Sequence, residues 1–384
     1  MSSVYFDNFT LILYIMIGII GGVCIKLANS NKTVAGTSLS GKELQFYGLF
    51  ILIFTSFAVV RQVSYEVGGT DAQRYIELFE TVLKYPGRFA DQEQLFLYLN
   101  IGVRYLTDDY HIYFLLVYGF ITFAYCYFIR TFCPKDVSYI PFLLLIWPYL
   151  KSFNTIRSSL AIAFFLIGLV MLKKKRTWLS VILIIATFFI HRMSLLYIPF
   201  LIFYRLFYEY ISHINGVRIY VFFAIYMVLG YWVATWVQEF VVASQLVFST
   251  SSDEWYLTQS LNSNLFSRWP MMFPYLLLLL SILFFSKKLP NSEVINYLKI
   301  FVFFDILMMI PSLIFNMWRA NEYLYVARLA MWGVLINIFL HKFHPTTRPF
   351  LQIGIFIGFL SWFVFRVYQE YEELSIMPYV FDLF

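Results

Sequence analysis

The sequence is poor in charged residues and in cysteine. Only 13% of its 384 residues are charged and 61% are hydrophobic, whereas soluble proteins carry about 25% charged residues. The three cysteines form no CxxC pair, which argues against a disulfide scaffold or a metal cluster. The sequence has no P-loop, HExxH or DxD motif, so it predicts neither nucleotide nor metal chemistry. Lipid must solvate most of this chain. Its net charge of +6 is therefore no sign of nucleic-acid binding, because what counts is the side of the membrane on which each charge lies.

Apolar runs long enough to cross a bilayer recur along the whole chain. A hydrocarbon core of about 30 Å needs roughly 20 residues of helix. We therefore predict an all-α polytopic membrane protein, a single integral membrane domain over residues 1–384 with about 12 transmembrane helices. The expected spans are 9–27, 44–60, 111–129, 138–150, 157–172, 177–192, 194–210, 219–238, 270–286, 298–316, 323–340 and 350–366.

The loops between these runs alternate in charge. If the basic run 173–176 is cytoplasmic, the inner side carries 16 basic and four acidic residues, and the outer side 12 basic and 17 acidic ones. This distribution places both termini outside, together with a large loop at 62–110 and a second loop at 239–269. Residues 1–10 carry a single acid and no basic residue, so no cleavable signal peptide is expected.

Arginine dominates the bases of the outer side, where it supplies ten of the 12. Its planar guanidinium grips phosphate or carboxylate in two places, which lysine cannot do. An anionic ligand at the outer face is therefore expected, with pairing to the outer acids as the alternative.

The loop at 62–110 has a soluble-like composition. Gly68 and Gly69 precede Asp71 and predict a turn that lies close to a ligand. The residues from Tyr75 onwards read as a short amphipathic helix lying on the membrane. A plain turn in which Asp71 caps a helix is the alternative.

Two further groups lie at the outer ends of successive spans. Asn154 and Arg157 share a helix face, and an arginine at that depth needs a partner, so Arg157 is a candidate functional residue. His191 closes the next span, and the tight turn at 173–176 makes the two spans neighbours. Beside an anion site, His191 becomes a candidate base. A structural ion pair for Arg157 and an interfacial hydrogen bond for His191 are the alternatives.

A last polar group precedes and enters the span at 323–340. If this helix begins near Glu322, Arg328 lies six residues in, about 9 Å below the outer surface. Arg319 reaches the same ligand only if it lies in the preceding loop. Asp305, within the previous span, is the alternative partner of Arg328.

The order of these features resembles the EpsG/Wzy-type polysaccharide polymerases of bacterial capsule and exopolysaccharide systems. The resemblance covers roughly residues 60–370 and rests on the GGTD-Y turn, the Glu93-Gln94-Leu95 segment, the N-x-x-R-x-x-L-A helix at Asn154, the KKK turn and the H-x-x-S helix end at His191. The chain departs from the family pattern at Gln94, at Ser158 and between His191 and Ser194.

The resemblance implies a metal-independent glycosyltransferase without a cofactor. Such an enzyme joins oligosaccharide repeat units carried on undecaprenyl diphosphate at the outer leaflet of the bacterial plasma membrane, and it releases undecaprenyl diphosphate. Besides this lipid-linked oligosaccharide, membrane lipids and other polysaccharide export or assembly proteins are the implied partners, and nucleic acid is not.

Residue roles follow from this resemblance as a hypothesis. Arg157, Arg319 and Arg328 bind the pyrophosphate, and His191 is the leading candidate base, with Asp71 second. The remaining substrate-binding candidates are Arg74, Tyr75, Asn154, Glu322 and Tyr323.

Two other functions compete with this one. A transporter or flippase for an anionic lipid-linked sugar is expected to carry internal repeats and polar residues down to the midplane, whereas the sequence shows no repeat and one plainly mid-span acid, Asp305. A membrane acyltransferase of extracellular glycans takes its acyl-CoA from the cytoplasm. It therefore predicts a cluster of polar catalytic groups in the inner loops, which here are short and rich in lysine.

Overall fold

The described part of the chain is helical. The computed structural model describes residues 5–30, 41–89, 92–133, 145–197, 292–314 and 322–382, and the separate positions 139, 209, 221, 225, 226, 229, 277, 278, 280, 281 and 289. Within these residues no strand forms, and a single isolated β-bridge joins Arg61 to Phe381. The predicted all-α class is therefore confirmed for this part of the chain.

Five helices in these ranges are long and apolar enough to cross a membrane. They are α1 (Asn8–Ser30), α2 (Gly41–Val59), α5 (Tyr110–Phe132), α8 (Ile156–Lys173) and α16 (Arg348–Leu374). The apolar helices α9 (Thr177–Ile190) and α15 (Tyr325–Leu340) are shorter. The other described elements are α3 (Ala72–Thr81), η1 (Pro86–Phe89), α4 (Gln94–Leu106), α7 (Ile146–Lys151), η3 (Arg192–Tyr197) and α14 (Glu293–Ile314).

The five long helices match predicted spans, and the expected total of twelve is not confirmed. Of the span predicted at 138–150, the structure describes Tyr139 and residues 145–150, which include most of the six-residue helix α7. The span predicted at 194–210 begins as the 3₁₀ helix η3. Most of 194–210, 219–238 and 270–286, and all of the predicted loop 239–269, lie outside the described residues.

The chain divides into two compact units. The first comprises Met1–Leu195 and Phe339–Phe384, and the second comprises Leu196–Ile338. The first unit contains α1 to α9 and α16, and the second contains α14 and almost all of α15. Each unit buries apolar side chains of its own, such as Ile121 and Leu166 in the first and Leu298 and Phe301 in the second.

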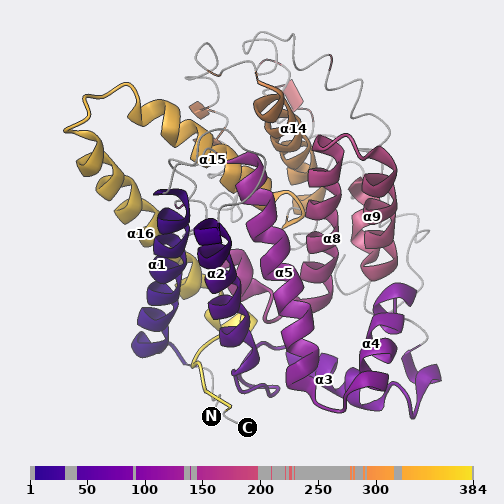
Figure 1. Ribbon diagram of the computed structural model, residues 1–384. Helices are drawn as coiled ribbons and strands as arrows, with labels where there is room; N and C mark the ends of the chain where they lie inside the picture. The colour runs from indigo at the N-terminus through magenta and orange to yellow at the C-terminus, as the bar shows by residue number, and fades with distance from the viewer. Residues whose placement is uncertain are drawn as a thin grey trace. The chain divides into compact units, whose positions relative to one another are not determined.

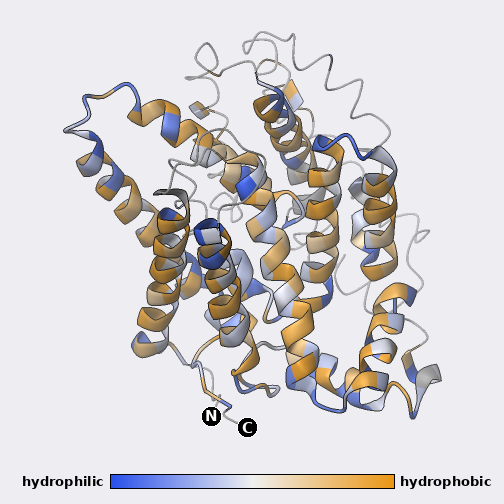
Figure 2. Ribbon diagram, viewed as in Figure 1, coloured by the Kyte–Doolittle hydropathy of each residue, from blue (hydrophilic) through white to orange (hydrophobic). Residues whose placement is uncertain are grey.

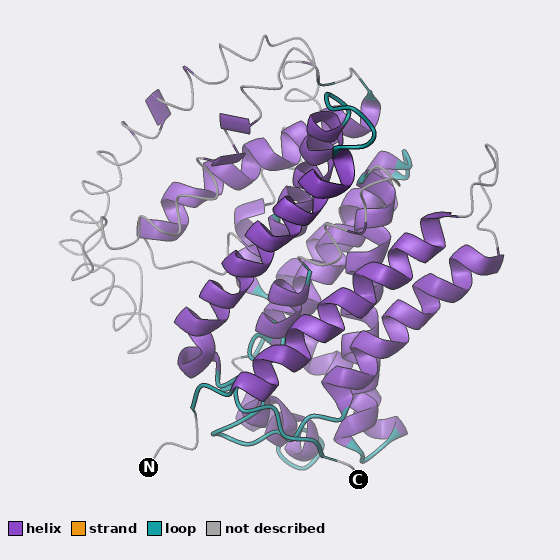
Figure 3. Ribbon diagram, turned by 90° about the vertical axis from the view of Figure 1, so that its left-hand side faces the viewer, coloured by secondary structure: helices purple, strands orange, loops and turns teal. Residues whose placement is uncertain are grey.

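A bundle of packed helices forms the first unit. Helices α1, α2, α5, α8 and α9 are neighbours in this order; α1, α5 and α8 run in one direction, and α2 and α9 run in the other (Figures 1 and 3). Helix α8 is apolar on every side, as expected for a helix surrounded by others, and 72% of its span is buried. Polar residues concentrate at the ends of the helices, as in the turn between α8 and α9 (Figure 2).

The start of α1 and the described end of the C-terminal tail, residues 379–382, lie at the same end of this bundle as α3 and α4, and the turn at 173–176 lies at the other (Figure 1). Hydrogen bonds fix the C-terminal tail there. Gln62 N donates to Val380 O over 2.7 Å and Asp382 N donates to Val60 O over 2.7 Å. Tyr379 N donates to Thr10 Oγ1 over 2.8 Å. The arrangement agrees with the predicted topology, in which the termini and the 62–110 loop share one side; which side faces outward stays a prediction.

Helix α5 begins with a titratable cap, which predicts a pH dependence of stability. Asp109 Oδ1 accepts from His111 N over 2.8 Å, and the backbone hydrogen bond from His111 is the main cause that lowers the pKa of Asp109 below its usual 3.8. A pKa depressed by folding stabilises the protein above the unfolded value, and the gain disappears as the pH falls through the folded value.

We therefore expect Asp109→Ala to lower the free energy of unfolding by about 1 kcal/mol at neutral pH. This difference from the wild type should vanish as the pH falls below the usual aspartate range. Thermal unfolding in detergent across that range is the measurement. Asp109→Asn is the matched control, because asparagine caps a helix about as well and does not titrate. A penalty for Asp109→Ala that stays constant with pH would contradict the assignment.

Candidate functional site

Four segments of the first unit meet at the end of the bundle that carries α3 and α4. They are the glycine turn before α3, the residues just before α4, the first turn of α8 with the residues before it, and the end of α9. Specific hydrogen bonds connect these segments, which are distant in the sequence.

The glycine turn lies directly against the backbone that leads into α8. Gly68 and Gly69 have φ angles of +82° and +113°, in the region that favours glycine. A Cβ on Gly69 would lie 2.4 Å from Phe153 O. Asn154 Oδ1 accepts from Asp71 N over 2.7 Å. The structure thus joins Asp71 and Asn154, which the sequence analysis treated as parts of separate groups.

The same turn is fixed from two other sides. Gly69 N donates to Ser375 O over 3.1 Å, and Thr70 Oγ1 donates to Glu373 O over 2.9 Å. The end of α16 and the residue that follows it therefore also hold the turn. Arg61 Nε donates to Gly68 O over 3.0 Å.

Arg61 has a structural environment rather than one suited to an external anion. Its side chain is buried, and its guanidinium carbon lies 4.7, 4.7 and 4.3 Å from the ring centroids of Phe114, Tyr118 and Phe153. Its Nη2 donates to the Tyr118 hydroxyl over 2.7 Å. This arginine, one of the ten assigned to the outer side, supports the glycine turn through Gly68 O.

Arg157 forms the central ion pair of the site. From the first turn of α8, its Nη1 donates to Glu93 Oε2 over 2.7 Å and to Gln92 Oε1 over 2.5 Å. Its Nε is buried and has no hydrogen-bond partner among the described residues. The Arg157 side chain is 21% exposed. One donor is therefore still to be satisfied beside an ion pair that solvent can reach.

Glu93 connects three helices. Besides its bond to Arg157, its Oε1 accepts from the backbone N–H of Arg192 over 3.1 Å. It stands at the N-cap position of α4 and makes no cap hydrogen bond with its side chain. The sequence analysis used Glu93 only as part of a family pattern and did not assign it a role. In a sequence, an acid just before a helix is a weak signal of function, because it can simply cap that helix. Only the structure shows that Glu93 does not.

His191 lies next to this ion pair along the chain. It is buried and ends α9, where its N–H donates to Thr187 O over 2.8 Å. The following amide, that of Arg192, is the one that binds Glu93. Ser194 Oγ is buried without a hydrogen-bond partner within the described residues. Glu93 binds both Arg157 and the Arg192 backbone N–H, and so connects Arg157 to the end of α9 that carries His191.

Asp71 lies at the start of α3 without capping it. Its side chain makes no cap hydrogen bond, so the alternative of a plain capping aspartate does not apply. Asp71 Oδ1 lies 3.7 Å from Arg74 Nη1, and the Arg74 side chain is 73% exposed. Tyr75 packs edge-on against Phe96 at a centroid distance of 5.8 Å. Arg74 is accessible to a ligand, whereas Tyr75 is partly packed.

In the second unit, Arg328 is engaged by Asp305. Its Nε and Nη2 donate to the two carboxylate oxygens of Asp305 over 2.7 and 3.0 Å, and both side chains are buried. This is the ion pair that the sequence analysis kept as the alternative. Helix α15 begins at Tyr325, three residues later than assumed, so Arg328 lies only three residues into it.

The other candidates of this region are placed only in part. Tyr323 is buried and its ring stacks on Tyr197 at 5.1 Å. Glu322 precedes α15 and is partly buried. Arg319 lies outside the described residues. In the part of the chain that the structure describes, no group of three His, Cys, Asp or Glu side chains is arranged to hold a metal ion.

The buried pair in the second unit gives a prediction. Replacing both partners by apolar residues, Asp305→Leu with Arg328→Met, removes two desolvated charges together. We expect a free energy of unfolding within about 1 kcal/mol of the wild type, or higher, because such replacements are often neutral or stabilising. Thermal unfolding in detergent measures this. An unfolding temperature well below that of the wild type would contradict this expectation.

Comparisons with known proteins point to one family. No curated protein and no solved structure matches the chain at a significant level. The EpsG family profile matches residues 47–381, which include the glycine turn, Glu93, Arg157 and His191. The chain therefore belongs to the EpsG family, and this membership suggests a polysaccharide polymerase-type function in a membrane.

Proposed function

We propose that the protein is a polysaccharide polymerase that joins oligosaccharide repeat units carried on undecaprenyl diphosphate. The reaction takes place at the extracytoplasmic face of the plasma membrane and releases undecaprenyl diphosphate. Family membership supports this class of activity. The observation that carries the assignment of the site is the ion pair between Arg157 and Glu93 at the N-terminus of α8.

This ion pair has the properties of a diphosphate site in its unliganded state. Arg157 combines an unsatisfied Nε with an Nη1 that holds one carboxylate. The first backbone N–H groups of α8 have no partner within the helix and carry partial positive charge, and Thr155 gives them no side-chain cap. A diphosphate carries more charge than Glu93 and competes with it for the same guanidinium. Glu93 then holds Arg157 in place until the lipid-linked substrate arrives.

The chemistry needs one anion site and one base. The acceptor hydroxyl oxygen bonds to the anomeric carbon of the donor unit, and the bond from that carbon to the diphosphate oxygen breaks. The diphosphate leaves with the electron pair, and Arg157 stabilises its growing charge. His191 accepts the hydroxyl proton and later releases it to water. Asp71 is the second candidate for this base, because its carboxylate does not cap α3 and is partly exposed.

Arg74 and Asn154 have distinct parts in this proposal. Arg74 is exposed beside Asp71 and is available to the sugar units. Asn154 fixes the glycine turn through Asp71 N and so positions Asp71 relative to Arg157. Tyr75, packed on Phe96, contributes a ring edge to the sugar path. Asn154 is thus a positioning residue here, whereas the sequence analysis had it contact the substrate.

The proposal is tested with purified protein in detergent and a synthetic lipid-diphosphate repeat unit. The product is separated on a gel, and a ladder of lengths is expected from the wild type. His191→Ala should remove the ladder, and His344→Ala, at an exposed histidine in the turn before α16, should leave it unchanged.

The variants also decide between the two bases. A working His191→Ala together with an inactive Asp71→Asn would move the base to Asp71. No ladder from folded protein that binds the lipid substrate, with several repeat units tried, would contradict the polymerase assignment. A flippase would then be the better explanation, and lipid translocation in vesicles would test it.

A further inference from the structure

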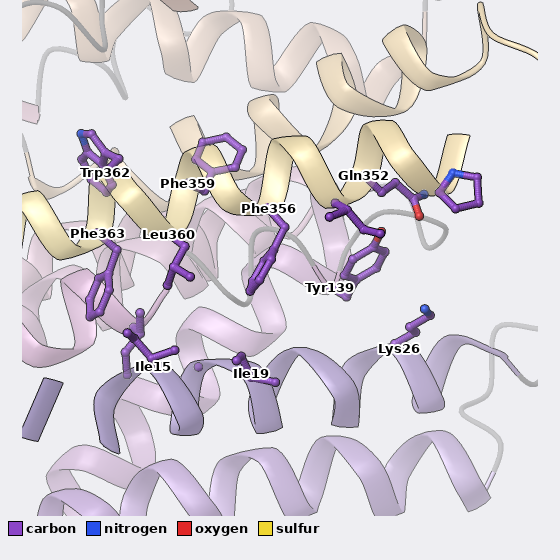
Figure 4. Close-up of a pocket in the computed structure, with 14 residues that line it drawn as sticks. Ile15, Ile19, Lys26, Tyr139, Gln352, Phe356, Phe359, Leu360, Trp362 and Phe363 are labelled. Atoms are coloured by element: carbon purple, nitrogen blue, oxygen red, sulfur yellow. The ribbon is translucent and has the colours of Figure 1, made fainter. Parts of the chain in front are cut away.

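Helices α1 and α16 enclose an apolar groove at the opposite end of the first unit from the candidate site. Its volume is about 360 Å³. Figure 4 shows Phe356, Leu360 and Phe363 of α16 directed towards Ile15 and Ile19 of α1 across this space. Only 11% of the α16 span is buried, so this helix is largely turned towards lipid. Helix α1 is 44% buried, so it is mainly the α16 side of the groove that opens to the hydrocarbon of the bilayer.

The groove is apolar along its length and polar at one end. Lys26, Tyr139 and Gln352 gather at this end, and Ile15 and Phe363 lie at the other (Figure 4). Lys26 is exposed, and its Nζ lies 5.6 Å from the Tyr139 ring centroid. No carboxylate of the described residues forms an ion pair with it. The groove therefore matches an amphipathic molecule with an apolar chain and an anionic head.

The length of the groove indicates which kind of lipid fits. Ile15 and Lys26 are separated by about 17 Å along α1, and Pro349 and Phe363 by about 21 Å along α16, at 1.5 Å per residue. One leaflet of the hydrocarbon core is about 15 Å thick. The groove thus spans one leaflet and ends near the middle of the membrane, as the acyl chain of a glycerophospholipid does.

Its position separates it from the diphosphate site. Thr10, near the start of α1, binds the C-terminal tail at the end of the bundle that carries α3 and α4. Lys26 lies 16 residues further along α1, about 24 Å away. A lipid whose diphosphate is on Arg157 cannot also place that group on Lys26. In the predicted topology, the Lys26 end faces the cytoplasmic leaflet.

We propose that this groove is a binding site for an anionic glycerophospholipid of the cytoplasmic leaflet. One acyl chain lies between α1 and α16 against the aromatic side chains of α16, and the phosphate binds Lys26. Such a site retains its lipid more firmly than the surrounding bilayer, because the charged contact and the apolar fit act together. The proposal does not depend on the polymerase activity.

The test measures which lipid stays with the protein. The full-length protein is equilibrated in mixed micelles with equal amounts of phosphatidylglycerol and phosphatidylcholine that carry the same acyl chains. Native mass spectrometry then counts the lipids bound. Preferential retention of one phosphatidylglycerol per chain is expected. Lys26→Gln should reduce that retention about tenfold, the effect of losing one charge-assisted contact.

Matched variants separate the site from general attraction to anionic lipid. Lys42→Gln removes an exposed lysine of α2 that does not line the groove, and it should not change retention. Ile19→Trp fills the groove and should reduce retention while Lys26 is kept. Thermal unfolding confirms that each variant is folded. Three results would overturn the proposal: equal retention of the two lipids, retention of phosphatidylglycerol by Lys26→Gln at the wild-type level, or displacement of phosphatidylglycerol by undecaprenyl phosphate.

Discussion

Arg157→Lys is expected to lower the rate of polymerisation by about 10²–10³-fold, the usual cost of losing one preorganised donor to a developing oxyanion. Arg157 uses Nη1 to bind Glu93 and Gln92 and has Nε left over. A lysine ammonium keeps the positive charge, but it is a single point charge. It cannot bind Glu93 in one direction and the diphosphate in another. The measurement is the initial rate of ladder formation with the lipid-diphosphate substrate in excess.

The control is an arginine of the same loop region outside the site. Arg88 lies exposed in η1, and Arg88→Lys should leave the rate unchanged. Thermal unfolding of Arg157→Lys should remain close to the wild type, because the ion pair with Glu93 can be kept by an ammonium. A rate within about threefold of the wild type would show that Arg157 is a structural partner of Glu93. That outcome would contradict the assignment of the diphosphate site to the N-terminus of α8.

The membrane helices of the first unit were predictable because their signal is local. An unbroken apolar run of about 20 residues specifies a spanning helix by itself. The predicted spans 9–27, 44–60, 111–129, 157–172 and 350–366 therefore appear as long helices, with ends shifted by one to eight residues. Ends are harder to predict, because caps and the first hydrogen bonds decide them. Helix α9 stops at Ile190 because His191 adopts an extended backbone.

The connections of the site were not predictable from the same signals. Glu93 and Arg157 are 64 residues apart, and Asp71 and Asn154 are 83 apart. Nothing in the spacing of either pair indicates that the side chains meet. Sidedness correctly grouped Arg61 with Arg157, because both lie at the same end of the bundle. It could not show that three aromatic rings surround Arg61 whereas Arg157 keeps a free donor.

Gly69→Ala is expected to destabilise the first unit by about 4 kcal/mol. The φ of +113° is strained for any residue with a Cβ and costs about 1–3 kcal/mol. The new Cβ would also lie 2.4 Å from Phe153 O, and this overpacking adds about 1–3 kcal/mol. Phe153 O belongs to the backbone that leads into α8, so relief of the contact must displace Asn154 and Arg157. The temperature of thermal unfolding in detergent and the polymerisation rate should therefore both fall.

Gly87→Ala is the matched control, because Gly87 lies in the same 62–110 segment with no atom within 4 Å of an added Cβ. We expect its effect to stay within about 0.5 kcal/mol. The pair of variants separates two explanations of the glycine turn. If Gly69→Ala unfolded at the wild-type temperature and kept full activity, the close approach of the turn to Phe153 would be of no consequence. A stable but inactive Gly69→Ala would instead mean that the turn matters for the geometry of Asp71 and Arg157 more than for the fold.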